Sequence, residues 1–492
     1  MSKPPRTQRL SKSRFVAGWQ CHKLLWWKVY EPDAPELQPD KVLQDRFDQG
    51  VQVGEVARTR FPGGVLIDLP YYDVEGKLAA TAAALQGDAS AIFEASFLAD
   101  DVFVAVDVLE RTHGGFNLIE VKSSSSQKDE HIPDAAVQTY VLEQCGIDVA
   151  GAEIMHLNKE YRFPDVGDLF ERTDVTTLVN EFLPRVPQAI EAQLAALRTP
   201  LPDIAIGPHC FEPRECPFVK RCWPQSPNHI KKLYNVGPKK ACSYMERGIH
   251  RISDIPAAQK LPAAARRQLV AMKEDRLVVE PGLASALDAF DTKLGFLDFE
   301  TVQRAIPVWP GTGPWKQSVA QFSYHEENGD GTHSHVGYLA EGPDDPRPAL
   351  ARNMLEVTAG AERIVMYSSF ERTMIRDLQS AVPELDGELK ELEDKLIDLL
   401  PVIRKNVYHP EFEGSFSLKY VLHPLVPELT YNDLVIVDGL VASVEIARLL
   451  FVAHKIPAAE RDRIRKDLLA YCERDTWAMV MLLQRLRGLA GR

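Results

Sequence analysis

The chain has 492 residues, a formal net charge of −13, 45% hydrophobic residues and 26% charged residues. This composition is typical of a soluble globular protein with two or three domains. No apolar run approaches the roughly 20 residues of a membrane span, and the basic N-terminus leads into no signal-peptide core, so we expect a cytoplasmic protein without a membrane partner.

The first 28 residues are rich in lysine and arginine and poor in acidic residues. Such a segment is expected either to contact phosphate or to be a solvated arm. The net negative charge of the whole chain does not exclude a nucleic-acid partner, because clustered metal-binding carboxylates contribute to it and local basic runs matter more.

A β-hairpin is predicted at residues 107–122, where two apolar-rich runs flank a turn at residues 112–115. Glu120 and Lys122 are two positions apart, so their side chains leave one face of the strand, and Asp107 lies on the opposite strand. Two carboxylates can bind Mg²⁺ or Mn²⁺, and a lysine can stabilise developing phosphate charge. The hairpin therefore predicts phosphodiester hydrolysis. Glu94, on a preceding strand, is either an accessory acid or a solvent-facing residue.

A helix carrying Gln138 and Tyr140 is predicted after a serine-rich loop that follows Lys122. Further on, three cysteines are six residues apart and interleaved with prolines, a pattern that can wrap a metal centre. Cys21, in a tryptophan-rich segment, is the candidate fourth ligand. The four thiols suit a [4Fe–4S] cluster, with Zn²⁺ or free thiols as alternatives. The proposed ligands are Cys21, Cys210, Cys216 and Cys222.

The D…E-x-K pattern of Asp107, Glu120 and Lys122 resembles that of the PD-(D/E)XK nucleases, in their RecB-like branch. The resemblance implies a restriction-endonuclease-like α/β domain in which Asp107 and Glu120 are metal ligands and Lys122 is catalytic. Where this branch often has an upstream histidine ligand, the comparable segment offers Glu55.

The helix after E-x-K resembles the corresponding helix of RecB-like nucleases, which carries a glutamine and a tyrosine. The resemblance implies that Gln138 helps shape the active site and that Tyr140 contacts DNA. The one-plus-three cysteine layout is similar to the iron–sulfur staple of AddB-type and CRISPR-associated exonucleases, although the cysteine spacing here is wider than in the family.

Residues 226–290 have the pattern of a helix-hairpin-helix module, with a turn at residues 235–238 followed by Lys239 and Lys240. The glycine in this turn permits close approach to phosphate, and the amides that open the next helix favour an anion. The two lysines are therefore candidate DNA contacts. A helical linker with a solvated lysine face is the alternative.

A second centre is predicted where a strand carries Asp298 and Glu300 on one face. Two like charges are costly to bury together unless a cation neutralises them. Glu371 lies near the start of a later helix. Near the C-terminus, Tyr471 and Asp475 are four residues apart and share one helix face.

This acidic pattern resembles that of the DEDD 3′→5′ exonucleases of the RNase H-like fold, in their tyrosine-bearing form. The resemblance implies that Asp298, Glu300 and Asp475 are metal ligands and that Tyr471 orients the attacking water. Glu371 stands where an aspartate is usual, and Asp398 is the other candidate for this middle acid.

The segment 407–431 resembles an uncharacterised bacterial family that joins the two nuclease types, and there Lys419 is expected to contact phosphate. We therefore expect an α/β protein with a nuclease domain at 1–225, a DNA-binding linker at 226–290 and an exonuclease domain at 291–492. The expected function is metal-dependent hydrolysis of DNA in repair, recombination or defence. A nucleic-acid-binding protein with inactive centres, or an RNA-processing exonuclease, is the alternative.

Overall fold

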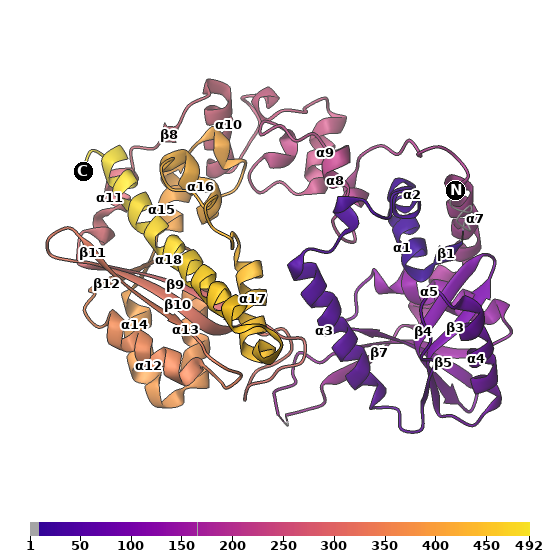
Figure 1. Ribbon diagram of the computed structural model, residues 1–492. Coiled ribbons are helices and arrows are strands. Elements are labelled where there is room, and N and C mark those ends of the chain that lie inside the picture. The colour runs from indigo at the N-terminus through magenta and orange to yellow at the C-terminus, as the bar shows by residue number, and fades with distance from the viewer. Residues whose placement is uncertain (1–8, 165) are drawn as a thin grey trace. The chain divides into compact units, whose positions relative to one another are not determined.

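The computed structural model describes residues 9–164 and 166–492 of a mixed α/β protein with several sheets (Figure 1). The chain divides into two compact units. The first contains the chain up to Trp223 together with Arg304–Val308 and Thr312–Trp315. The second contains Pro224–Gln303, Trp309–Gly311 and Lys316–Arg492, so the segment 226–290 is part of the second unit.

The first unit is built on a seven-stranded sheet with the order β2-β3-β4-β5-β6-β7, and β1 also pairs with β4. The central strands β3, β4 and β5 are antiparallel, whereas β6 is parallel to β5. Pairing of Thr112 with Gly115 confirms the predicted hairpin. The strands are β1 Leu10–Ser11, β2 Val65–Leu66, β3 Ala91–Ala99, β4 Val102–Thr112, β5 Gly115–Lys122, β6 Val149–Leu157 and β7 Phe170–Asp174.

Helices cover both faces of this sheet. Leu109 and Leu118 pack with α5 in the larger core, whereas the alternate residues Val108 and Ile119 pack with α3 in a smaller one. This alternation is expected of a sheet buried on both faces. The helices are α1 Lys12–Gln20, α2 His22–Tyr30, α3 Lys41–Arg58, α4 Val74–Gln86, α5 His131–Gln144, α6 Thr176–Phe182, α7 Val186–Leu197 and α8 Val219–Cys222.

The second unit is built on a five-stranded sheet with the order β11-β10-β9-β12-β13. Its first three strands are antiparallel, and β12 and β13 run parallel to β9. A separate small sheet pairs β8 with β14. The strands are β8 Val278–Val279, β9 Leu294–Val302, β10 Ser318–Glu327, β11 His333–Leu339, β12 Arg363–Met366, β13 Leu396–Asp398 and β14 Val407–Tyr408.

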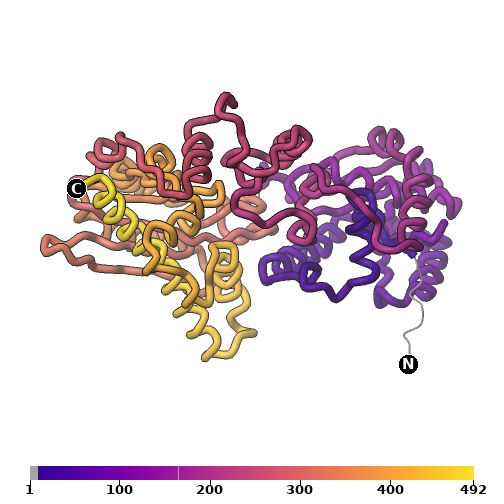
Figure 2. Tube along the Cα trace, turned by 90° about the horizontal axis from the view of Figure 1, so that it is seen from above, coloured from indigo at the N-terminus to yellow at the C-terminus, as the bar shows by residue number. Residues whose placement is uncertain are grey.

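Alternate residues of β9 point to opposite faces of this sheet. Leu297 and Phe299 pack with α12, α13 and α14, whereas Leu294 and Phe296 pack with the long C-terminal helix α18. α18 lies along β9, β10 and β11 (Figure 1), and Figure 2 shows the same C-terminal segment in yellow. These helices are α12 Arg347–Thr358, α13 Phe370–Ala381, α14 Asp386–Lys395, α15 Leu400–Asn406, α16 Leu418–Leu425, α17 Gly439–Phe451 and α18 Ala458–Leu489.

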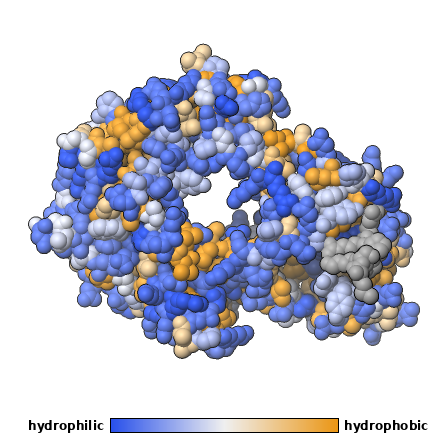
Figure 3. Space-filling view, turned by 45° about the horizontal axis from the view of Figure 1, so that its top comes forward, coloured by the Kyte–Doolittle hydropathy of each residue, from blue (hydrophilic) through white to orange (hydrophobic). Residues whose placement is uncertain are grey.

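The start of the second unit has a small hydrophobic core of its own, which includes Ile230, Tyr244 and Ile252. It contains α9 Pro238–Glu246 and α10 Ala263–Glu274, and α11 Leu283–Ala286 follows them. Among the described residues no helix is both long and apolar enough to cross a membrane. The face of the molecule seen in Figure 3 is mostly hydrophilic, with hydrophobic residues in small patches.

Candidate functional site

In the first unit, the edge of β4 that faces away from β3 is shared by two strands. β1 pairs with Val102 and Phe103 at one end of β4, and β5 pairs with Val108 and the residues after it. Asp107 lies where β1 and β5 separate, and its carboxylate accepts a hydrogen bond of 2.8 Å from the backbone N–H of Val121. This gap in the sheet brings the start of α1 to the same place as the D…E-x-K residues.

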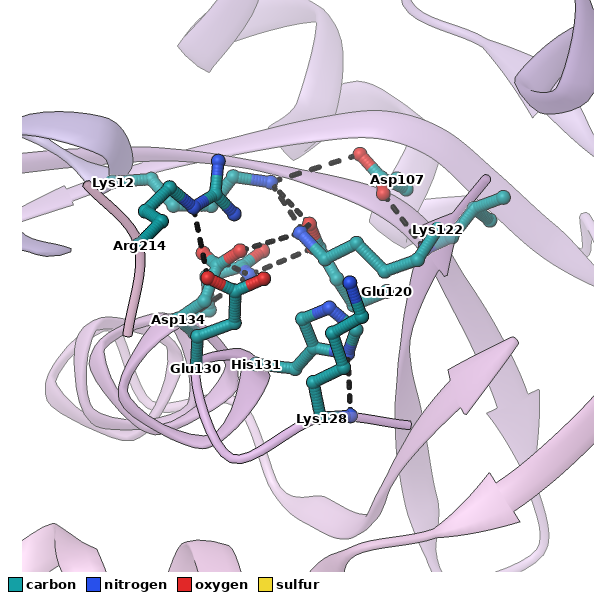
Figure 4. Close-up of polar contacts among 11 residues, drawn as sticks. Lys12, Asp107, Glu120, Lys122, Lys128, Glu130, His131, Asp134 and Arg214 are labelled. Carbon is teal, nitrogen blue, oxygen red and sulfur yellow. Dashed lines mark hydrogen bonds and ion pairs between the residues drawn. The ribbon is translucent and has the colours of Figure 1, made fainter. Parts of the chain in front are cut away.

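Glu120 is the centre of the polar contacts at this gap (Figure 4). Its side chain is only 2% exposed, and Lys122 donates to it at 2.7 Å. Lys12, the first residue of α1, donates to both of its oxygens at 2.8 and 3.0 Å and lies 3.7 Å from Asp107. The Gln138 amide donates to Glu120 at 2.9 Å. The structure thus brings Asp107, Glu120, Lys122 and Gln138 together, and it adds Lys12.

Helix α5 contributes a third carboxylate, which the sequence reasoning missed. Asp134 lies one helical turn before Gln138 and forms an ion pair of 2.6 Å with Lys122. The four-residue spacing from Gln138 is the sequence signal that could have identified it. Because Glu120 and Asp134 both contact Lys122, its ammonium group is held in one position at the end of β5.

The pKa values of the three carboxyl groups at this site are shifted in different directions. Burial and the neighbouring Glu120 raise the pKa of Asp107 to about 7. Burial also raises the pKa of Glu120, but Lys12 and Lys122 lower it more, so that its pKa lies below the ordinary value. Burial and Glu120 raise the pKa of Asp134. Asp107 is therefore the carboxyl group that an added cation would stabilise most in its ionised form.

A cavity of about 610 Å³ opens beside these residues and is lined by Asp107, Glu120, Lys122 and Glu94, together with one side of α3. Glu55 is on α3 but is exposed and does not line the cavity, because Gly54 and Arg58 face it instead. The structure therefore does not bring Glu55 to the carboxylates. Glu94, within β3, has a left-handed backbone conformation with φ of 58°.

Tyr140 is on α5 but away from the carboxylates. Its hydroxyl donates to Asp100 at 2.6 Å, and burial together with this carboxylate raises the Tyr140 pKa to about 12. The ring packs against the main core of the first unit. Tyr140 and Gln138 are two residues apart on a helix, so they point in different directions. The contacts of Tyr140 with Asp100 and with the core hold its side chain in the fold of the first unit, away from the carboxylates.

The four predicted cluster cysteines lie together. Cys21, between α1 and α2, and Cys210, Cys216 and Cys222, near the end of the first unit, line one small cavity. None of these four cysteines forms a disulfide bond. Burial raises the pKa of Cys216 to about 11, so its thiolate requires a nearby cation. The donor set and this buried thiol fit a metal centre.

The second unit brings three carboxylates together beneath α18. Oxygen atoms of Asp298 and Glu300 on β9 and of Asp475 on α18 all lie within 4.8 Å of one another. Side chains two apart on a strand share a face, which explains why Asp298 and Glu300 point to the same helix. Glu371, in the first turn of α13, is 3% exposed, and its Oε2 atom has no hydrogen-bond partner.

Burial dominates the electrostatics of this cluster. It raises the pKa values of Asp298 and Glu300 well above their ordinary ranges, and the neighbouring Asp475 raises both further. Burial raises the pKa of Glu371 to about 8 and that of Asp475 to about 6. Three buried acids and the half-buried Asp298, all with raised pKa values, and one unpartnered oxygen form a site that a divalent cation would stabilise. The residues present therefore fit metal binding.

Two tyrosines and a lysine complete the second cluster. Tyr431, which the sequence reasoning missed, donates its hydroxyl to Asp475. A hydrogen bond from Tyr471 also lowers the pKa of Asp475. The ammonium of Lys419, on α16, lies 5.1 Å from the ring centre of Tyr471 and 5.6 Å from that of Tyr431. Tyr431 lies in a loop far from both acidic motifs, and no spacing pattern points to it.

A cavity of about 770 Å³ gives access to this cluster, and Asp298, Glu300, Asp475, Tyr471 and Lys419 line it. The structure also separates the two candidates for the middle acid. Asp398 accepts hydrogen bonds from the backbone N–H groups of Ser368 and Leu400, at 3.1 and 2.9 Å. Its carboxylate therefore stabilises the local backbone turn. Glu371, by contrast, has a buried carboxyl oxygen without a hydrogen-bond partner, and its charge raises the pKa of Asp298. The geometry favours Glu371.

The predicted DNA-contact lysines Lys239 and Lys240 are exposed in the first turn of α9. The preceding Gly237 begins the helix in an extended conformation, and Asn235 has a left-handed φ of 59°. The turn and helix start predicted at 235–238 are thus present, and both lysines are accessible to solvent.

Residues 295–417 match the model of a domain of unknown function, DUF2779. The chain is also similar to "Uncharacterized protein UU173" of Ureaplasma parvum serovar 3, with 25% identity over 221 residues. This alignment covers 40% of the chain and about a third (32%) of the relative's length. A family B DNA polymerase from Pyrobaculum calidifontis is similar at 15% identity and a TM-score of 0.26, over 39% of this chain and 24% of the polymerase.

Proposed function

We propose that this protein is a metal-dependent nuclease with two separate centres that hydrolyse phosphodiester bonds of DNA. The observation that carries the proposal is the cluster of Asp298, Glu300 and Asp475, which β9 and α18 bring together at an accessible cavity. The buried Glu371 of α13 is close enough to raise the pKa of Asp298. Buried acids with raised pKa values and two nearby tyrosines suit divalent-metal phosphoryl chemistry.

In this proposal the second unit is an RNase H-like exonuclease of the DEDD type. Asp298, Glu300, Glu371 and Asp475 would hold Mg²⁺ or Mn²⁺, which when bound polarises the phosphodiester and makes water a better nucleophile. Tyr471 lines the cavity beside Asp475 and would orient the attacking water. Lys419 lines the same cavity and would contact a phosphate of the strand that is being trimmed.

The first unit would be a RecB-like PD-(D/E)XK nuclease, in which Asp107 and Glu120 hold the metal ion. Lys122 is fixed by Glu120 and Asp134, so its ammonium group would stabilise negative charge on the phosphate. Gln138 donates to Glu120 and would keep that carboxylate in position. The exposed Lys239 and Lys240 would bind the DNA backbone without reading its sequence.

We also propose that the four cysteines hold a [4Fe–4S] cluster. A tetrahedral zinc site with Zn–S bonds of about 2.3 Å places its sulfur atoms roughly 3.8 Å apart. Among the described residues, no three cysteine sulfurs lie within 4.8 Å of one another, although all four cysteines line one cavity. This wider set suits a cluster better than a single zinc ion. Free thiols suit a reducing compartment, so we propose the cytoplasm.

A second candidate function is nucleic-acid binding with a silent first centre. The position of Lys12 favours it, because its ammonium group contacts both Glu120 and Asp107, the acids that a metal ion would need. In that case the N-terminal unit would bind DNA while only the second unit cleaves it.

The test uses the full chain and end-labelled single-stranded DNA, duplex DNA and RNA, each with Mg²⁺, Mn²⁺ or a chelator. We compare the wild type with Lys122→Ala, Asp298→Asn and the double variant. Exposed Lys159→Ala and Asp386→Asn are the matched controls. Each single variant should lose one metal-dependent activity, and the double variant should lose both. Metal-dependent cleavage that survives in the double variant would disprove the proposal, whereas loss in Asp298→Asn alone would support the second candidate.

A further inference from the structure

A second cluster of metal-binding side chains lies under α18 and is made of different residues. Nitrogen atoms of His325 on β10 and of His335 on β11 and an oxygen of Glu473 on α18 all lie within 4.8 Å of one another. The two histidines are directly paired across the antiparallel strands, and their ring centres are 4.5 Å apart. His325 is buried, whereas Glu473 approaches from the solvent side.

A chain of hydrogen bonds determines which ring nitrogens carry protons. Thr476 donates its hydroxyl hydrogen to the backbone carbonyl of Glu473, an atom that can only accept. Thr476 therefore accepts from Ser323, at 2.8 Å, and from Nδ1 of His325, at 2.8 Å. Because Ser323 donates to Thr476, it accepts from Nε2 of His335, at 2.9 Å.

This network leaves one unprotonated nitrogen on each imidazole, namely Nε2 of His325 and Nδ1 of His335. Nδ1 of His335 lies 3.8 Å from the Glu473 carboxylate. Metal-binding histidines in proteins usually donate their other ring N–H to a fixed acceptor, which sets the tautomer and ring orientation. Ser323 and Thr476 supply such acceptors here. Two imidazoles, each with one unprotonated nitrogen, and a carboxylate are thus brought together.

We propose that His325, His335 and Glu473 bind a divalent transition-metal ion, with Zn²⁺ as the best match. Imidazole nitrogens favour Zn²⁺, Co²⁺ or Ni²⁺ over Mg²⁺, and three protein ligands leave one position for water. The ion would fasten the edge strand β11 to α18. The proposal does not depend on nuclease activity, because none of its ligands belongs to the carboxylate cluster.

The location gives this ion a role in positioning the neighbouring cluster. Thr476 directly follows Asp475 on α18, and Ser323 pairs with Asp298 across the sheet. The hydroxyl bond between Ser323 and Thr476 therefore joins the strand and the helix that carry two of the acids. Fixing the two imidazoles would fix these hydroxyl groups as well.

The test measures Zn²⁺ binding to the full chain by equilibrium dialysis and by competition with a chromophoric chelator. All proteins carry Asp298→Asn and Glu300→Gln, so that the carboxylate cluster does not contribute. The His325→Gln/His335→Gln variant should bind one Zn²⁺ per chain fewer than its parent. His113→Gln, at the exposed tip of the β4–β5 hairpin, is the matched control and should bind as the parent does.

Glu473→Gln provides the decisive measurement if the double histidine variant fails to fold, since the Glu473 side chain is 52% exposed. It should weaken Zn²⁺ binding at this site by on the order of tenfold or more. X-ray absorption at the zinc edge should show imidazole scattering that the histidine variant lacks. Equal zinc content and affinity in the parent, Glu473→Gln and the folded histidine variant would overturn the proposal.

Discussion

Lys12 and Glu120 are 108 positions apart in the chain and form an ion pair of 2.8 Å. Their contact is possible because β1 pairs with only one end of β4, so α1 begins beside the hairpin. The ammonium of Lys12 also lies 3.7 Å from Asp107. A metal ion bound by these two carboxylates would have to share them with a lysine.

Replacing Lys12 by glutamine should therefore strengthen metal binding at the first centre. Removing a positive charge beside two acids is expected to favour a cation by about 1 kcal/mol, or roughly fivefold in affinity. The measurement is the Mn²⁺ concentration that gives half-maximal cleavage in an Asp298→Asn background. Lys159→Gln, an exposed lysine of the same unit, should leave this concentration unchanged. A higher Mn²⁺ requirement in Lys12→Gln would show that Lys12 assists metal binding.

Tyr471→Phe should slow 3′→5′ trimming strongly while single-stranded DNA still binds. The hydroxyl lies beside Asp475, and loss of one group that positions water typically costs on the order of a hundredfold in rate. The assay uses a 5′-labelled oligonucleotide in a Lys122→Ala background, so that the first centre is silent. Equal rates with and without the hydroxyl, or shortening from the 5′ end, would contradict this role.

Tyr431→Phe should act on metal affinity more than on the rate at saturating metal. Its hydroxyl donates to Asp475 and lowers the pKa of that carboxyl group. Without this hydrogen bond the pKa of Asp475 rises, so at a fixed pH near 6 less of the ionised ligand is present. We expect several times more Mg²⁺ to be required at pH 6 and a smaller difference at pH 8. The comparison with Tyr471→Phe separates a ligand-orienting tyrosine from a water-orienting one.

The metal-free protein should lose stability as the pH rises from about 5 to about 8. The folded-state pKa values of Glu371, about 8, and Asp475, about 6, lie above those of ordinary carboxyl groups. A raised carboxyl pKa means that the unfolded chain releases its proton first, so the stabilisation is complete at low pH and is lost through this window. Each pKa unit corresponds to about 1.4 kcal/mol, and about 1 kcal/mol shifts Tm by roughly 2–4 °C.

The measurement is Tm against pH in the presence of a chelator. Glu371→Gln removes one buried ionisable group and should flatten the fall in Tm. Glu384→Gln, at an exposed position in the same unit, should not. Saturating Mg²⁺ should raise Tm most at pH 8, where the acids are ionised. A Tm that rises from pH 5 to pH 8 in the metal-free wild type would contradict the assigned shifts.

Cys216→Ser should remove the proposed cluster and destabilise the first unit. Anaerobically purified wild-type protein should contain about four iron and four sulfide per chain. Cys216 is buried against Phe218 and Trp27, and metal-centre formation is coupled to folding, so both iron content and Tm should fall. Cys145→Ser, at an exposed cysteine, should change neither. One zinc in place of iron would disprove the cluster.

Local patterns predicted the features that depend on neighbouring residues. The hairpin of β4 and β5 follows from two apolar runs and a turn, and the shared face of Asp298 and Glu300 follows from strand alternation. The family resemblance supplied Gln138, which the structure places at 2.9 Å from Glu120. Each of these predictions rests on residues that are close together in the sequence, or on a motif that recurs in a known family.

Relations set by tertiary packing were not predictable in this way. Lys12 reaches Glu120 because β1 and β5 share one edge of β4, a pairing that no spacing encodes. Tyr431 reaches Asp475 from a loop 44 residues earlier. Glu55 has the right residue type for a ligand, but the rotation of α3 turns Gly54 and Arg58 toward the cavity instead.

The strand that carries Asp298 and Glu300 leads within a few residues into a piece of the other unit. Ala305 donates to the side chain of Gln49, and Trp315 donates at 2.5 Å to the carbonyl of Ser123, the residue after Lys122. Segments 304–308 and 312–315 are thus structural parts of the first unit, although they lie some 80 positions beyond its main segment, which ends at Trp223. A truncated protein ending at residue 223 would lack the partner of Gln49, and a fragment starting at residue 224 would expose Trp315. The two halves should therefore be better expressed together, as complementing fragments, than apart.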